Sequence, residues 1–312
     1  MKTVEDIPIA VPVPVSVPVQ AQTNPDYNNP SPSAPIAPIA PPVGIEHQKS
    51  SFYVATTHTA SNKFSDYQIK QLRDQGYTTG QIHELLLFTK TFSLRFWVVD
   101  NSGSMSLNDG HRFVNTKNQN TVKMVSCTRW KEIQEAVDYH AQLAALLQAP
   151  TTFRLLNNPG VHVGPQEFSI GTNGLSSIDR DLQLARNVIK NASPQGVTPL
   201  AQHVLDIRKQ VYDLAPSLRQ QGRRVAIILA TDGLPTNEYG ISGRQSNDEF
   251  TGALRSLEGL PVWIVIRLCT DEDKVVDVSI ERRLQSNPFW IQSSQFFTKN
   301  VCHFIFPVLQ QY

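Results

Sequence analysis

The sequence of 312 residues is poor in charge and contains no long apolar run. Charged residues make up 18% of the chain, below the share of about a quarter that is usual in soluble domains. Basic and acidic residues nearly balance, 28 against 27, whereas a general nucleic-acid binder carries a basic excess. No stretch approaches the ~18 consecutive apolar residues of a membrane-spanning helix. We therefore expect no nucleic-acid partner and no membrane span.

Cysteine is also scarce. The three cysteines, Cys127, Cys269 and Cys302, are too few and too scattered for a disulfide scaffold, and they lack the paired spacing of a zinc site. Free thiols in a reducing compartment are the simplest interpretation, so we expect a cytoplasmic protein.

Phosphate-binding loops are missing too, because neither Gly-x-x-x-x-Gly-Lys-Ser/Thr nor Gly-x-Gly-x-x-Gly occurs.

Proline, by contrast, is abundant, and eleven of the 21 prolines lie in residues 1–42. Each proline removes a backbone donor and disfavours helix at the preceding residue. We expect residues 1–50 to form a disordered tail of polyproline II character. Glu5 and Asp6 stand where a secretory signal would be basic, so no signal peptide is expected. A PxxP-type ligand is an alternative role for the tail, although no Arg or Lys is near to orient it.

A helical pattern follows over residues 64–90. Apolar residues recur at helical spacing on both sides of a break at Asp74-Gln75-Gly76, which has the composition of a helix C-cap. Thr78 and Thr79 can cap a second helix. The pattern predicts a helical hairpin that packs against the next domain.

From residue 92 onward, strand-length apolar runs alternate with amphipathic helices. Strands that are apolar on both faces and alternate with helices indicate a mostly parallel sheet covered on both sides. The predicted fold of residues 92–312 is therefore α/β, doubly wound and Rossmann-like. The expected strands are 94–99, 152–156 with 161–163 as a short hairpin, 224–230, 261–268, and a last strand at either 289–291 or 304–308. The expected helices are 130–147, 178–192, 200–214, 248–257 and 271–285.

Three oxygen-rich loops fall where such a sheet binds its ligands, beyond the carboxyl ends of the strands. The first strand is followed by Asp100, Ser102 and Ser104 at alternate positions, and the strand 224–230 is followed by Thr-Asp-Gly with Asp232. Between them, Thr198 is expected to be the N-cap of a helix that begins with proline. Short oxygen side chains of this kind suit a hard divalent cation.

The order of these motifs resembles the von Willebrand factor type A (VWA) domain and its metal-ion-dependent adhesion site. The resemblance covers residues 92–312 and implies that one Mg²⁺ (or Mn²⁺) ion is surrounded by Asp100, Ser102, Ser104, Thr198 and Asp232. It implies that the hydroxyls of Ser102 and Ser104 bind the ion directly and that Thr198 does so in one state. The two carboxylates would bind the ion either directly or through water. Mg²⁺ prefers octahedral oxygen coordination, so a position stays open. In the family, an acidic side chain of a partner fills it.

Residues 106–128 form a longer and more polar connection than is usual in that family. Alternation over 111–115 and 121–125 predicts a β-hairpin beside the metal loop. We expect this insertion to select the partner, because its basic residues would favour an acidic segment. These residues are Arg112, Lys117 and Lys123.

Enzymatic interpretations are weaker. The nucleophile motif Gly-x-Ser-x-Gly is absent, and the histidine nearest to the metal loop, His111, lies in the insertion. Carboxylates that share a cation stay ionised and cannot donate a proton near neutral pH. The expected function is non-enzymatic, Mg²⁺-dependent binding of a protein that presents Asp or Glu. The alternatives are a substrate-delivery subunit of an AAA⁺ or metal-chelatase machine, a secreted adhesion protein and a metallohydrolase, and the oligomeric state is left open.

Overall fold

A computed structural model of the chain describes residues 63–115, 122–269 and 289–292. The chain divides into two compact units, Met1–Ser50 and Ser51–Tyr312, and every described residue lies in the second. The predicted disordered tail over residues 1–50 lies outside the described residues. The helical pattern of residues 64–90 belongs to the same unit as the sheet.

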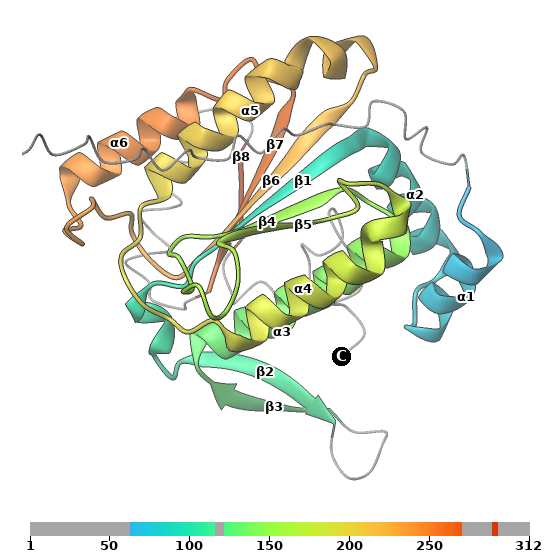
Figure 1. Cartoon of the computed structure of the whole chain (residues 1–312), viewed down its shortest axis with the longest axis horizontal. Helices are drawn as coiled ribbons and strands as arrows, with labels where there is room; N and C mark the ends of the chain where they lie inside the picture. The colour runs from blue at the N-terminus through green and yellow to red at the C-terminus, as the bar shows by residue number, and fades with distance from the viewer. Residues whose placement is uncertain (1–62, 116–121, 270–288, 293–312) are drawn as a thin grey trace, which may run out of the picture. The chain divides into compact units, whose positions relative to one another are not determined.

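The second unit is built on a six-stranded sheet with the order β5-β4-β1-β6-β7-β8 (Figure 1). All neighbouring strands pair in parallel except β4 and β5, which are antiparallel. The mostly parallel sheet is therefore confirmed. The strands are β1 (Phe92–Val99), β4 (Thr151–Leu155), β5 (Glu167–Ile170), β6 (Arg224–Thr231), β7 (Val262–Leu268) and β8 (Phe289–Gln292).

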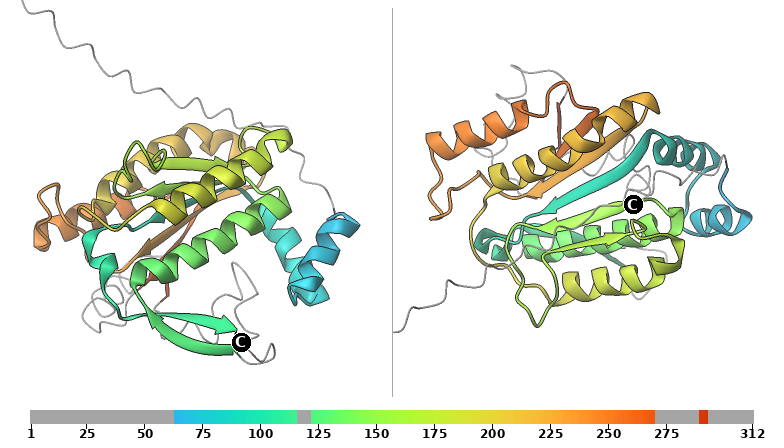
Figure 2. Two further views of the ribbon diagram at one scale, coloured as in Figure 1. Left: turned by 60° about the horizontal axis from the view of Figure 1, so that its bottom comes forward. Right: turned by 45° about the horizontal axis from the view of Figure 1, so that its top comes forward.

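Helices cover both faces of this sheet because its central strands are apolar on both sides. In β1, Trp97 and Val99 join one buried cluster, whereas Phe96 and Val98 join the other. The first cluster is closed by α3 (Arg129–Leu147) and α4 (Ile178–Asn191), and the second by α5 (Leu200–Gln220) and α6 (Arg244–Arg255). Figure 2 shows the two helix pairs on opposite sides of the strands. The doubly wound α/β fold is confirmed.

Two short helices precede the sheet, α1 (Asp66–Asp74) and α2 (Thr79–Thr91). Both begin with a capping box, and the N-cap of α2 is Thr78, as predicted. Their buried side chains, among them Leu72 and Leu85, form a third cluster with Leu143 and Leu147 of α3. The predicted helical hairpin and its packing are confirmed, and α2 runs directly into β1.

The predicted insertion hairpin is also present. β2 (Gly110–Asn115) and β3 (Val122–Cys127) form a separate antiparallel sheet in which Phe113 stands opposite Met124. In Figure 1 this hairpin lies below α3. A 3₁₀ turn, Gly103–Ser106, lies between β1 and the hairpin.

The expected strand at 161–163 is wrong, because this segment is a turn. Val161 is 88% exposed there, and Val163 is only partly buried against the core. The partner of β4 is instead β5, where Phe168 pairs with Phe153 and both are buried.

Helix limits differ from the expected ones at two places. α5 continues to Gln220 through Pro216, because Leu218 beyond the proline is buried against the sheet. α6 begins at Arg244, four residues earlier than expected, where the Ser246 hydroxyl accepts a hydrogen bond from the Gly243 amide. The expected helix 271–285 and strand 304–308 lie outside the described residues, and β8 matches the alternative at 289–291. No described helix is long and apolar enough to cross a membrane.

Candidate metal centre

The candidate site lies where β1 and β6 end at the same edge of the sheet. These strands are parallel neighbours, and the Asp100 amide donates to the Ala230 carbonyl at 2.8 Å. Asp100 and Asp232, which are far apart in the sequence, therefore follow adjacent strand ends. Both are buried, with exposed fractions of 0% and 1%. The topology thus brings the two predicted carboxylates together.

Hydrogen bonds join four of the five predicted ligands into one network. The Ser102 amide donates to Asp100 Oδ1 at 2.8 Å, and the hydroxyls of Ser102 and Ser104 are 3.1 Å apart. Ser104 Oγ donates to Asp232 Oδ1 at 3.0 Å. The other oxygen of Asp100 accepts from Thr231 Oγ1 at 2.6 Å. Five oxygen-bearing side chains at the ends of β1 and β6 are thereby held in contact.

Thr198 occupies the third loop, which lies beside the first. The Gly103 amide donates to the Gly196 carbonyl at 3.3 Å, and the amide of Thr198 donates to Thr236 Oγ1 at 2.9 Å. The prediction that Thr198 is the N-cap of α5 is wrong, because Pro199 takes that position without a side-chain cap. Within the described residues no hydrogen bond joins the Thr198 hydroxyl to the other four predicted ligands.

Two asparagines that the motif analysis did not single out lock the loops together. Asn101 is fully buried, and its side-chain Nδ2 donates to the backbone carbonyl of Asn157 at 3.0 Å. Its Oδ1 accepts from the backbone amide of Asn157 at 2.8 Å. The Asn157 side chain in turn bonds the carbonyl and the amide of Val197 at 2.8 and 3.2 Å. Asn101 stands inside the first motif, but nothing in the sequence links it to residue 157.

Arg129 is a further site residue that the sequence did not reveal. It is 3% exposed, and it holds Asp109 with two nitrogens at 2.6 and 2.5 Å. Its third contact is to Asp232 Oδ2 at 3.0 Å. Arg129 is the first residue of α3, one position before the helix start predicted from apolar spacing.

The charges of this group favour an additional cation. Burial, and then the negative charge of Asp232, raise the pKa of Asp100 to about 6. Burial lowers the pKa of Arg129, but its hydrogen bonds with Asp109 and Asp232 outweigh that effect and raise it. Three carboxylates and one guanidinium leave two negative charges around the loops, which a divalent ion would balance.

The donor set fits a hard divalent cation. All candidate ligands are oxygens, and each carboxylate oxygen of Asp100 and Asp232 accepts one described hydrogen bond, so each retains acceptor capacity. No group of three or more His, Cys, Asp or Glu side chains suited to a metal occurs among the described residues, so hydroxyls would have to complete the coordination. Ser104 and Gly103 are exposed, so the network is open to solvent.

No protein-family model matches the chain, and no similar protein was found among the curated proteins. The resemblance to VWA domains therefore depends on the order of the sequence motifs alone.

The insertion hairpin borders the site through its two ends, since the Arg129 amide donates to the Leu107 carbonyl at 2.9 Å. Arg112, one of the basic residues expected to favour an acidic partner segment, pairs with Glu135 of α3 at 2.8 Å. Lys117 lies outside the described residues, and Lys123 is exposed. The backbone amide of His111 donates to Glu132, which fixes β2 along α3.

Proposed function

We propose that this protein is a Mg²⁺- or Mn²⁺-dependent interaction module of the VWA type that binds an acidic residue of a partner protein. The observation that supports it most is the hydrogen-bonded network of Asp100, Ser102, Ser104 and Asp232 at one sheet edge. A cation bound there would be held by Asp100, Asp232 and the serine hydroxyls, with Thr198 in the adjacent loop as the remaining candidate ligand.

The chemistry of this donor set explains why the partner would be acidic. The carboxylates and Arg129 together carry two negative charges. A divalent ion would therefore bring the net charge of the site close to zero. Mg²⁺ keeps octahedral coordination and retains water where protein ligands are missing. A carboxylate that replaces such a water gains an ionic bond, whereas an amide of the same shape gains only a dipole contact. The exposed Ser104 and Gly103 leave room for its approach.

The hairpin β2–β3 supplies the second part of the proposed binding surface. Phe113 and Met124 stand opposite each other and are 45% and 53% exposed. On the other face, Arg112 turns to Glu135, so this apolar pair points away from α3. Exposed apolar side chains are typical of interaction surfaces, and the ends of this hairpin border the candidate metal centre. We expect the partner to carry an apolar residue near its coordinating carboxylate.

Metal binding is tested first with Asp100→Asn, which keeps the shape of the side chain but removes its charge. We expect Mg²⁺ and Mn²⁺ affinity, measured by calorimetry, to fall by at least about tenfold. The matched control is Asp138→Asn, because Asp138 lies on α3 and pairs with Arg186 outside the site. Unchanged affinity in Asp100→Asn, beside an unchanged circular dichroism spectrum, would remove the basis of the proposal.

Partner binding is tested by capture from lysate in Mg²⁺ and in EDTA, followed by mass spectrometry. In a captured protein, replacement of the candidate Asp or Glu by its amide should abolish the EDTA-sensitive part of the affinity. The double variant Phe113→Ser with Met124→Ser should weaken partner binding while Mg²⁺ affinity stays the same. A partner whose amide variant binds as tightly as the original would show that the ion is not the point of contact.

A further inference from the structure

Three arginines line an open hollow at the edge of the sheet opposite the candidate metal centre. Arg219 belongs to the last turn of α5, and Arg223 and Arg224 lead into β6. Because β6 runs from here to Thr231, the hollow and Asp232 lie at opposite ends of the same strand. The hollow measures about 430 Å³, within the range of about 300–1,000 Å³ that is usual for small-molecule sites. Its lining residues are Arg219, Gly222, Arg223, Arg224, Gly259, Leu260, Pro261 and Val262.

The positive charge of this hollow is not balanced by the residues that form it. The lining contains three guanidinium groups and no acidic side chain. None of the three arginines forms an ion pair with a described residue, whereas Arg154, for example, pairs with Glu167. Glu258 precedes Gly259 in the sequence, but it does not line the hollow. The hollow therefore presents an excess of positive charge to whatever enters it.

These arginines are not needed to cap α5. Arginines near the end of a helix often bind its last carbonyls, but here backbone amides already do so. The amides of residues 221, 222 and 223 donate to the carbonyls of residues 217, 219 and 218. Arg219 Nη2 donates to the Gly259 carbonyl at 2.6 Å, which ties the end of α5 to the loop before β7. The side chains of Arg223 and Arg224 make no hydrogen bond within the described residues, so their donors are available to a ligand.

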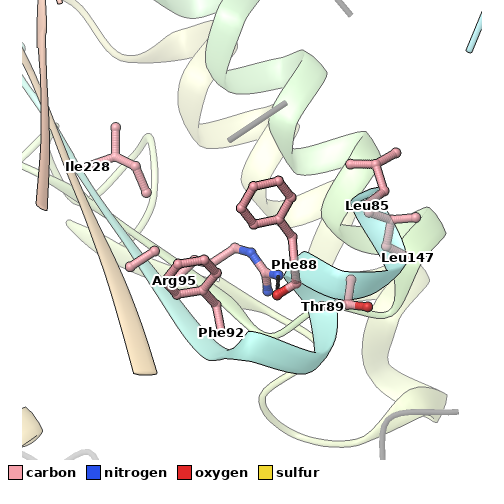
Figure 3. A pocket seen from close by; sticks show the side chains of 8 residues that line it. Leu85, Phe88, Thr89, Phe92, Arg95, Leu147 and Ile228 are labelled. Carbon is pink, nitrogen blue, oxygen red and sulfur yellow. Dashed lines mark hydrogen bonds between the residues drawn. The ribbon is translucent and has the colours of Figure 1, made fainter. Parts of the chain in front are cut away.

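A buried arginine near the start of β1 differs from these three. Arg95 is 6% exposed, its Nη2 donates to the Phe88 carbonyl at 3.3 Å, and its Nη1 is buried without a partner in the described part of the chain. The hollow beside it has mostly apolar walls and encloses only about 10 Å³, room for about one water-sized group (Figure 3). A ligand larger than water therefore does not fit beside Arg95, whereas the hollow at the starts of β6 and β7 is open and large enough.

We propose that the hollow at the starts of β6 and β7 binds a soluble small molecule that carries two or more phosphate charges. Several guanidinium forks can share the oxygens of tetrahedral phosphates, and each N–H then donates a charge-assisted hydrogen bond. Three positive charges suit such a ligand better than a single carboxylate. Leu260, Pro261 and Val262 are partly buried and would contact the organic part of the ligand. The lining has no exposed large apolar side chain to enter a bilayer, which favours a soluble ligand over a phospholipid headgroup.

The test uses ADP, pyrophosphate and adenosine, each titrated into the full chain in EDTA and measured by calorimetry. EDTA removes divalent ions, so the result does not depend on the candidate metal centre or on the proposed function. We expect ADP to bind, pyrophosphate to bind more weakly, and adenosine not to bind detectably. The affinity for ADP should fall as the salt concentration rises, because salt screens exposed charges. If ADP does not bind, or if adenosine binds as tightly as ADP, the proposal is overturned.

The double variant Arg223→Gln with Arg224→Gln locates the site. We expect its affinity for ADP to fall by at least about tenfold, with an unchanged circular dichroism spectrum. The matched control is Arg73→Gln with Arg244→Gln, which removes the same charge at exposed positions of α1 and α6 that do not line the hollow. An equal loss in both double variants would show that only the net charge of the chain attracts ADP, and would overturn the site. The comparison of ADP with adenosine needs no variant, so a poorly folding variant would not leave the question open.

Discussion

Replacing Arg129 by Met tests the electrostatics of the candidate metal centre directly. The change removes the guanidinium that joins Asp109 to Asp232 but keeps an unbranched side chain. Asp232 has a fully buried side chain, so its carboxylate would then lie in the interior without its cation. Breaking a buried pair in this way costs about 3–5 kcal/mol. We expect that loss in the free energy of unfolding when the protein is measured in EDTA.

In excess Mg²⁺ the loss should be smaller, because the metal ion takes over the neutralisation of Asp232. The ion also no longer meets the opposing charge of Arg129. A concentration of 100 times the dissociation constant stabilises a protein by about 2.7 kcal/mol, and each tenfold gain in affinity adds about 1.4 kcal/mol. If the variant binds Mg²⁺ at least about tenfold more tightly, Mg²⁺ should stabilise it by about 1.4 kcal/mol more than it stabilises the wild type.

The assay is urea unfolding of both proteins, followed by fluorescence, in EDTA and in excess Mg²⁺. Arg154→Met is the matched control, because Arg154 pairs with Glu167 between β4 and β5 and forms no described hydrogen bond or ion pair with the five candidate ligands. Its destabilisation should be the same with and without Mg²⁺. An Arg129→Met variant that loses the same free energy under both conditions would refute the idea that a cation binds beside Asp232.

Two further predictions concern stability. Burial, and then Arg267, lower the pKa of His140 to about 3, against about 6.5 in the unfolded chain. The unfolded state therefore binds more protons than the folded state between these two pH values. As a result, stability falls as the pH drops through that window. His140→Phe should therefore remove about 2 kcal/mol of the stability lost between pH 7 and pH 5. A variant whose stability falls as much as that of the wild type over this range would contradict the prediction. Gly196→Ala places a Cβ 2.4 Å from the Asn157 side chain at a φ of +78°, and should cost about 2 kcal/mol or more in thermal unfolding. Gly222→Ala, with φ +64° and open space, should cost only about 1 kcal/mol, so similar losses would argue against the Asn157 brace.

The sequence was sufficient to predict the strands and helices that carry their own pattern. β1, β6 and β7 are apolar on both faces, which only a sheet with two covered sides can accommodate. The hairpin β2–β3 and the start of α2 likewise follow from local alternation and capping. The errors occurred where burial overrode local signals, as in the continuation of α5 through Pro216.

Four of the five candidate ligands could be found from the sequence because they follow apolar runs that end in polar motifs, and parallel strands place such ends at one edge. Thr198 was found instead from its place before a helix that begins with proline. The contacts of Arg129 with Asp109 and Asp232 could not be found, since they join residues 20 and 103 positions apart through side chains alone. The buried Arg95 is a similar case. In the sequence it is one charge inside an apolar run, and only packing under α2 shows that it has no anionic partner among the described residues.

Local periodicity, capping and the order of motifs therefore determined the fold class and four hydrogen-bonded site residues, because these depend on neighbours along the chain. The charge balance of the site, the brace between Asn101 and Asn157, and the isolation of Arg95 were decided only by the tertiary structure. Burial and long-range pairing set those properties, and neither is encoded in the spacing of residues along a strand or helix.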